Sequence, residues 1–177
     1  EYIARAFHTA RQADPNGVLL FTAVNHPAPQ DTGSSGVVNK MYTTVKQLKS
    51  QGVPIDVVGM QMHLLLPWET SVPPQKADVI ATMQKFAALG VRIYVTEMDV
   101  DLAGQPGSQV EKWTFEAGVY GDIMEACIES GVCDSFATWG ISDAISWISC
   151  DSIGCLNEKD ADPLMFDPSY APKPAYF

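Results

Sequence analysis

The sequence lacks the features that would mark a nucleic-acid-binding protein, a membrane protein or a zinc protein. It has 11 Lys and Arg against 21 Asp and Glu, for a net charge of −10, and it has no basic stripe that could neutralise phosphates. Its apolar runs fall well short of the roughly 18 residues that a membrane-spanning helix needs. Its four cysteines are not spaced as zinc-knuckle ligands are. We therefore expect no nucleic acid and no membrane as a partner, and no metal site.

The remaining composition is that of a folded domain. An apolar content of 46% over 177 residues allows a real core, and the length fits one domain or a large part of one. No signal peptide is recognisable, but the sequence opens abruptly inside a helical pattern. We therefore expect the natural N-terminus to lie elsewhere.

The four cysteines form two close pairs, Cys127 with Cys133 and Cys150 with Cys155. If oxidised, each pair closes a small loop, a constraint worth about 2 kcal/mol on a chain-entropy estimate. Local disulfides favour a secreted, extracellular protein, because the cytosol keeps thiols reduced. The alternative is four free buried thiols, since cysteine is often buried without pairing.

A helical pattern alternates four times with an extended apolar run. The expected strands are residues 18–24, 55–62, 91–97 and a run near 136–141. Their centres recur about every 40 residues, which is typical of helix–strand alternation and a parallel sheet. A closed (β/α)8 TIM barrel needs about 250 residues, so we expect roughly half of one. An open doubly wound sheet is the alternative, but no Gly-rich phosphate loop follows any strand.

Polar or aromatic side chains follow every expected strand. They are Asn25, Gln61 with His63, Glu97 with Asp99, and Trp139 with Asp143. The carboxyl ends of barrel strands meet at one rim, where barrel enzymes carry their chemistry, so we expect these residues to lie together. Glu97 ends an apolar strand, where a carboxylate is costly to bury unless it is paired or functional. The plain alternative is an acidic residue that opens a loop.

The spacing of the polar pairs favours direct contact between them. Gln61 and His63 are two residues apart, as are Glu97 and Asp99, so on strands the members of each pair face the same way. A histidine beside two carboxylates can donate a hydrogen bond to one of them and keep it ionised as a nucleophile. A core histidine bonded to backbone is one alternative. A metal held by the histidine and both acids is another.

Three tryptophans lie near the expected strand ends. Trp68 is in a proline-rich loop after the second strand, and Trp139 and Trp147 follow the fourth. Flat aromatic faces with few charges suit sugar rings, although core packing is the better explanation for any single tryptophan. Three of them near the same strand ends favour carbohydrate binding.

Taken in order, these motifs resemble the C-terminal half of the endo-1,4-β-xylanases of glycoside hydrolase family 10. The matching segments are residues 6–15, 52–63, 95–99, 139–147, 163–167 and 173–176. The resemblance runs from end to end, so it implies that residues 1–177 are one unit, the C-terminal half of that family's catalytic barrel. It implies a retaining enzyme that hydrolyses internal β-1,4 bonds of xylan or xylooligosaccharides.

The resemblance also implies roles for matching residues. Glu97 would be the nucleophile, with His63 hydrogen-bonded to it and Asp99 behind the histidine. The sugar-binding residues would be Gln61, Asn25, Trp139 and Trp147. A disulfide between Cys127 and Cys133 resembles one that is frequent in fungal members. No metal or organic cofactor is implied.

Two features depart from the family pattern. The family's acid/base glutamate lies on an earlier strand, within a Trp-Asp-Val-Val-Asn-Glu type motif that does not occur here. We therefore expect a missing N-terminal half, in the same polypeptide or a separate chain, to supply that acid, and we expect this chain alone to be nearly inactive. Residues 22–25, Thr-Ala-Val-Asn, keep only the last residue of the family's Asn-Asp-Tyr-Asn. A non-catalytic carbohydrate-binding module derived from the same fold is the alternative function.

Overall fold

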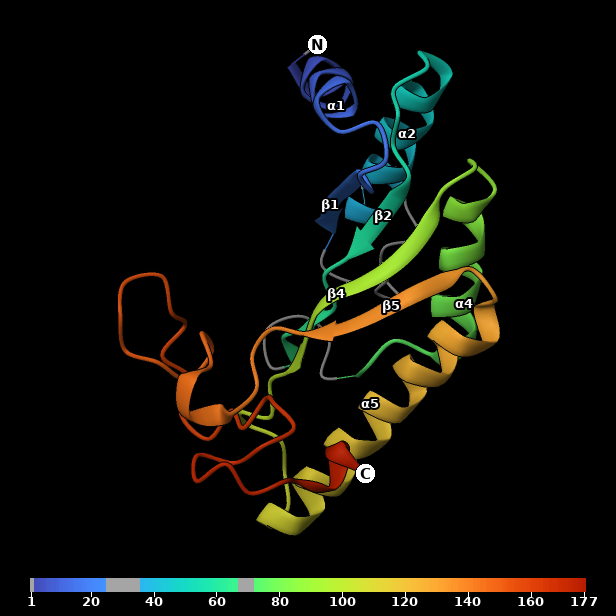
Figure 1. The fold of residues 1–177 in the computed structure, drawn as a ribbon. Coiled ribbons are helices and arrows are strands. Elements are labelled where there is room, and N and C mark those ends of the chain that lie inside the picture. Colours follow the sequence, from blue (N-terminus) through green and yellow to red (C-terminus); the bar gives the residue numbers. More distant parts are fainter. Residues whose placement is uncertain (1, 25–35, 67–71) are drawn as a thin grey trace.

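A computed structural model describes residues 2–24, 36–66 and 72–177 (Figure 1). The helices are α1 (Tyr2–Ala13), α2 (Val37–Ser50), α4 (Lys76–Ala87) and α5 (Gln109–Ser130). The strands are β1 (Leu20–Val24), β2 (Val57–Met60), β3 (His63–Leu64), β4 (Arg92–Val100) and β5 (Cys133–Thr138). Two short 3₁₀ turns follow, η1 (Asp143–Ile145) and η2 (Pro174–Tyr176). Asn25 and Trp68 lie outside the described residues.

All the strands are parallel, and their order in space follows their order in the chain. β2 pairs with β1 on one side and β4 on the other, and β5 pairs with the far side of β4. β3 continues the line of β2 and pairs with the last part of β4. A doubly wound sheet would reverse its strand order at a switch point, whereas a barrel does not. The four helix–strand units expected from the sequence are therefore present in a barrel-like order.

The helices cover one face of the sheet. α4 and α5 pack side by side against it, and the opposite face carries no helix from the described residues (Figure 1). We call this opposite face the open face. It is marked by Gly59, because a Cβ atom there would lie 2.9 Å from Cβ of Thr22 and 3.1 Å from Cγ2 of Thr96. A side chain at position 59 would thus collide with its neighbours on that face.

β4 contains one extra residue in the middle of the strand. From Met60 to His63 the chain advances three residues, while the paired residues Val95 to Asp99 advance four. Against β5 the same shift occurs, because Val95 to Met98 spans three residues and the partners in β5 span two. An insertion of this kind is a β-bulge, which changes the side of the sheet to which later residues point.

The bulge places Glu97 on the open face. The residues of β4 that pack into the helix-covered core, all 0% exposed, are Ile93, Val95, Met98 and Val100. Odd numbers before the bulge and even numbers after it therefore face the helices. Glu97 and Asp99 consequently share the open face with Thr96, whereas an uninterrupted strand would have sent Glu97 into the core.

The strand ends differ from the sequence expectation. β4 was expected to end at Glu97 but runs to Val100, because its last part pairs with β3. β5 begins at Cys133 and ends before Trp139, about three residues earlier than expected, because it pairs with β4 from Ile93 onward. Between β2 and β3, Met62 adopts a left-handed conformation with φ 63°, which interrupts the expected continuous strand.

α5 is the longest helix, and its ends show why it begins and stops where it does. Ser108 accepts a hydrogen bond from the backbone of Glu111, whose side chain accepts one from the backbone of Ser108. This reciprocal pair satisfies free backbone groups at the start of the helix. Gly131, at φ 68°, ends it in a left-handed turn. None of the helices in the described part of the chain has the length and apolarity that a membrane crossing requires.

Candidate active site

Glu97, His63 and Asp99 are joined in a line of hydrogen bonds at the carboxyl end of the sheet. Nε2 of His63 lies 3.1 Å from Oε2 of Glu97. Nδ1 of His63 lies 2.9 and 3.0 Å from the two carboxylate oxygens of Asp99. The pairing of His63 on β3 with Asp99 on β4 places the ring beside both acids. The sequence prediction that these three residues meet is therefore correct in geometry.

Both ring nitrogens of His63 face carboxylate oxygens, which determines the protonation of the ring. An ionised carboxylate only accepts hydrogen bonds, so a histidine between two of them must donate from both nitrogens and is a cation. Burial on its own lowers the pKa of His63, but the hydrogen bonds and negative charges of Asp99 and Glu97 outweigh it and leave that pKa above its ordinary value. Both observations favour the protonated form of the ring.

Two tryptophans flank this line of residues. The indole N–H of Trp147 donates to Oδ2 of Asp99 at 2.7 Å, and its ring lies edge-on to His63 with 5.1 Å between centroids. Trp139 lies on another side of His63 at 6.1 Å, also edge-on, and is 49% exposed. Both tryptophans thus lie beside His63, the ring that is bonded to Glu97. An exposed aromatic face beside a carboxylate is suited to a sugar ring.

Exposure increases along the line toward Glu97. The side chain of Asp99 is 0% exposed, that of His63 10% and that of Glu97 16%. Burial raises the pKa of Asp99, while the hydrogen bonds from His63 and Trp147 act in the opposite direction. Glu97 is thus the member of the line that an incoming molecule reaches, and the two residues behind it hold it in place.

The other sequence-predicted site residues are less fully placed. Gln61 is half-buried in the break between β2 and β3, and its carbonyl oxygen accepts the backbone N–H of Glu97 at 3.0 Å. Asn25 lies outside the described residues. The metal alternative has no geometric support in the described ranges, where no group of three His, Cys, Asp or Glu is arranged to hold an ion. Both nitrogens of His63 are already used in hydrogen bonds to carboxylates.

All four cysteines are paired in disulfides, Cys127 with Cys133 and Cys150 with Cys155. The first joins the last turn of α5 to the first residue of β5. The second closes a loop shortly after Trp147. The alternative of four free thiols does not describe this structure.

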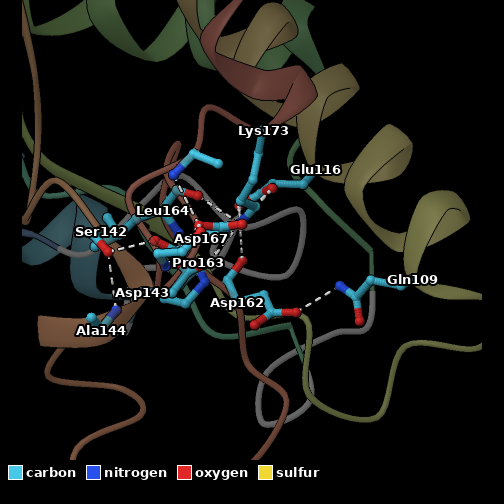
Figure 2. A network of polar contacts seen from close by, with 12 residues as sticks. Gln109, Glu116, Ser142, Asp143, Ala144, Asp162, Pro163, Leu164, Asp167 and Lys173 are labelled. Atoms are coloured by element: carbon cyan, nitrogen blue, oxygen red, sulfur yellow. Dashed lines mark hydrogen bonds and ion pairs between the residues drawn. The ribbon is translucent and has the colours of Figure 1, made fainter.

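A second cluster of charges, which sequence reasoning missed, surrounds Lys173 (Figure 2). The ammonium group of Lys173 is 1% exposed and lies 2.9 Å from Glu116 on α5 and 3.1 Å from Asp143 on η1. It also donates to the carbonyl oxygens of Asp162 and Leu164, at 2.7 and 2.6 Å. A buried lysine with this many acceptors joins three segments that are far apart in the sequence.

The Lys173 cluster supports the segment that carries the tryptophans. Oδ1 of Asp143 accepts the backbone N–H of Leu164 at 2.8 Å, and the hydroxyl of the preceding Ser142 donates to the carbonyl of Asp167 at 2.7 Å (Figure 2). Burial raises the pKa of Glu116 to about 8 and that of Asp143 to about 6, although Lys173 opposes both shifts. The segment between Trp139 and Trp147 is thereby tied to the C-terminal stretch.

Comparison with known proteins identifies the class to which this barrel and its carboxylate site belong. The family model described as glycosyl hydrolase family 10 matches residues 1–177. Endo-1,4-beta-xylanase B of Thermotoga neapolitana is 33% identical over 179 residues, covering 100% of this chain and 46% of that protein. The chain belongs to glycosyl hydrolase family 10.

Solved structures agree with this assignment. Xylanase 10B from Thermotoga petrophila RKU-1, determined in complex with xylobiose, matches with a TM-score of 0.80 and 29% identity over 99% of this chain and 49% of that one. Native xylanase 10B from Thermotoga maritima matches with the same TM-score and 31% identity. The chain spans about half the length of these proteins, and its fold is about half of a (β/α)8 barrel.

Proposed function

We propose that this chain is the C-terminal, nucleophile-bearing half of a retaining endo-1,4-β-xylanase, which hydrolyses internal β-1,4 bonds of xylan. The observation that carries the proposal is the line from Trp147 through Asp99 and His63 to Glu97. It holds one carboxylate in a fixed orientation and partly open to an incoming molecule. The names of the relatives support xylan as the substrate, and one solved relative was determined with xylobiose.

In the proposed first step, an oxygen of Glu97 attacks the anomeric carbon of the sugar. The bond from that carbon to the glycosidic oxygen breaks, and the leaving oxygen takes a proton from a second carboxyl group. In the second step, water attacks the same carbon and gives a proton to that carboxylate, and Glu97 leaves as a carboxylate. Retaining glycosidases place their two carboxyl groups about 5–5.5 Å apart for this reaction.

The charged His63 serves this reaction by holding Glu97 in one orientation. A hydrogen bond from a cation stabilises the ionised nucleophile, and the same bond fixes the oxygen that does not attack. Asp99 balances the positive charge of the ring from the buried side, and the indole of Trp147 keeps Asp99 in place. Trp139, which is half exposed, would lie against the sugar ring.

We propose that the acid/base carboxyl comes from the N-terminal half of the barrel, supplied by the same polypeptide or a separate chain. Among the described residues, the acid that shares this line with Glu97 is Asp99, and it is already bonded to His63 and Trp147. The open face supports this proposal as well. A closed barrel fills its interior with side chains from all eight strands. Here Thr22 is exposed, and Leu20 is 37% exposed.

The test compares xylan hydrolysis by the chain alone, by the chain joined to an N-terminal half from a family member, and by the joined protein carrying Glu97→Ala. We expect reducing sugar from the joined protein only, because general acid catalysis is typically worth about 10²–10⁴-fold. Xylooligosaccharide binding by the joined protein without turnover would instead support the carbohydrate-binding module. We also propose a secreted protein, which the two disulfides support.

A further inference from the structure

Trp147 is the last residue in the line of hydrogen bonds that runs from Glu97 through His63 and Asp99. Its indole N–H holds Asp99 at 2.7 Å, and Asp99 holds His63 through both carboxylate oxygens. A displacement of the Trp147 side chain therefore reaches the ring of His63 through one intervening carboxylate. The orientation of Glu97 therefore depends on the position of the Trp147 backbone.

Trp147 lies on a segment that is itself neither helix nor strand. Within the described residues, η1 ends at Ile145 and no regular element follows until η2. The side chain of Trp147 packs against a small buried cluster of Ala103, Ile148 and Ala161, and the backbone around Trp147 is bonded to the returning stretch 156–158. The N–H of Leu156 donates to the carbonyl of Trp147 at 3.0 Å, and the N–H of Glu158 donates to the carbonyl of Ile148 at 2.8 Å. This returning stretch is the backbone support of Trp147 and Ile148.

The Cys150–Cys155 disulfide closes the loop that leads from Trp147 to the returning stretch. Residues 151–154 are all exposed, and Ile153 has no protection from solvent. The loop, orange in Figure 1, projects away from α4 and α5 and so lies apart from the core that they cover. Apolar packing at the loop tip therefore contributes little to its position. At the loop tip the disulfide bond restrains the backbone, as a hydrophobic core would do elsewhere.

The Cys127–Cys133 disulfide is a natural reference for this role. Cys127 lies within the 22 residues of α5, and Cys133 is paired with Ile93 at the start of β5. Helix and sheet hydrogen bonds keep both of these segments in place whether or not the bond is present. The two disulfides span similar sequence separations, 6 and 5 residues, so they constrain the unfolded chain to a similar extent.

We propose that the Cys150–Cys155 disulfide is a positioning element of the active site, which fixes the stretch 156–158 behind Trp147 and thereby keeps the indole N–H on Asp99. Its kinetic consequence rests on the proposed function, but the hydrogen bond is observable without turnover. The disulfide makes no contact with substrate in this proposal. It acts through Trp147.

The experiment replaces each disulfide by a pair of serines in the complete polypeptide. The nuclear magnetic resonance signal of the Trp147 indole N–H is assigned by its loss in Trp147→Phe. In Cys150→Ser/Cys155→Ser we expect this signal to move toward that of an exposed indole and kcat/KM on xylan to fall about 10- to 100-fold, because small misplacements near a reacting group have costs of that order. In Cys127→Ser/Cys133→Ser we expect the signal to stay and kcat/KM to change less than about threefold, with a comparable loss of Tm.

A double-mutant cycle separates positioning from a general loss of stability. If the disulfide acts through Trp147, adding Trp147→Phe to Cys150→Ser/Cys155→Ser causes no loss beyond that of Trp147→Phe alone. Additive losses, or an unmoved indole signal, would overturn the proposal. If the serine variant does not fold, the signal is followed while a phosphine, itself oxidised to its oxide, reduces the disulfides of the native protein. An absence of xylan hydrolysis in the unmodified protein would defeat the proposed function and leave the indole result to decide this inference.

Discussion

Two clusters in this molecule are built from the same parts, one base and two carboxylates, and they differ in what surrounds them. The open cluster contains His63, Glu97 and Asp99, and the closed cluster contains Lys173, Glu116 and Asp143. In the closed cluster each side chain is at most 2% exposed, and two backbone carbonyl oxygens also accept hydrogen bonds from the ammonium group. In the open cluster one member, Glu97, keeps 16% exposure.

The difference shows why one arrangement suits chemistry and the other suits structure. Every donor of Lys173 is directed at the protein, so the closed cluster can join three segments but cannot receive a substrate. The base of the open cluster donates to both acids and leaves part of one acid facing outward. Placement on the open face, which follows from the bulge in β4, makes that acid accessible.

The comparison is tested most strongly by making the same substitution in both clusters. Glu97→Gln should lower kcat/KM on xylan at least about 10⁴-fold, because an amide cannot act as the nucleophile. Glu116→Gln should leave kcat/KM within about threefold, because Glu116 lies on α5 and its ion-pair partner is Lys173, outside the line from Trp147 to Glu97. Both rates are measured in the complete polypeptide by release of reducing sugar. Equal losses in the two variants would remove the distinction between the clusters.

Removing the base of the closed cluster should produce the next largest effect. Lys173→Met leaves Glu116 and Asp143 buried without their cation, and breaking a buried pair in this way typically costs about 3–5 kcal/mol of unfolding free energy. The matched control is Lys76→Met, whose ion pairs with Glu125 and Glu129 are exposed, so it should change the unfolding free energy little. Denaturant titration compares the two. Similar small changes would show that the buried lysine does not hold the segments together.

Within the open cluster, Asp99→Asn should change the titration of His63. Burial lowers the pKa of His63 and Asp99 is a main group that raises it, so the neutral amide should bring that pKa down. We also expect kcat/KM to fall about 10²-fold, because the ring then loses its charge and its fixed orientation. Nuclear magnetic resonance titration of His63 is the measurement, with Asp134→Asn as an exposed carboxylate control. An unchanged His63 pKa would contradict the assigned hydrogen bonds.

The last prediction concerns the pH dependence of the closed cluster, whose effect on the unfolding free energy builds up gradually over several pH units. Burial raises the pKa of Glu116 from 4.5 to about 8, so the folded state favours the protonated side chain. The contribution of this side chain to the unfolding free energy is therefore fully present below pH 4.5 and is lost as pH rises toward 8. Glu116→Gln cannot ionise, so its deficit relative to the unmodified protein should shrink over this window, by at most about 1.4 kcal/mol per pH unit. Unfolding free energies at several pH values test this. A deficit that does not depend on pH would mean that Glu116 is ionised throughout.

Much of the fold followed from local patterns. Helical spacing and apolar runs predicted the four helix–strand units, and the two-residue spacing of the polar pairs predicted that His63 would meet Glu97 and Asp99. Both predictions, however, assumed unbroken strands. The bulge in β4 and the left-handed Met62 depend on pairing with neighbouring strands, which no local pattern reports. The roles of these residues in catalysis stay predictions.

The closed cluster illustrates what sequence reasoning could not reach. A lysine between two prolines near the end of the chain reads as a solvated surface residue. Its burial depends on Glu116, 57 residues earlier, and on Asp143, 30 residues earlier. The one local signal of this cluster was an acidic residue, Glu116, at a position of α5 that faces the core. Glu116 lies three residues before Val119 and seven before Ile123, both buried on the same side of that helix.

The central claim is that Glu97 bonds covalently to a sugar. It is tested most directly by incubating the complete polypeptide with a 2-deoxy-2-fluoro xylobioside that carries a dinitrophenyl leaving group, which departs without acid assistance. Mass spectrometry of the intact protein and of its peptides should show one added fluoroxylobiosyl group on the peptide that contains Glu97, and none in Glu97→Gln. An adduct on a different carboxylate, or none in a protein that turns over xylan, would contradict the account.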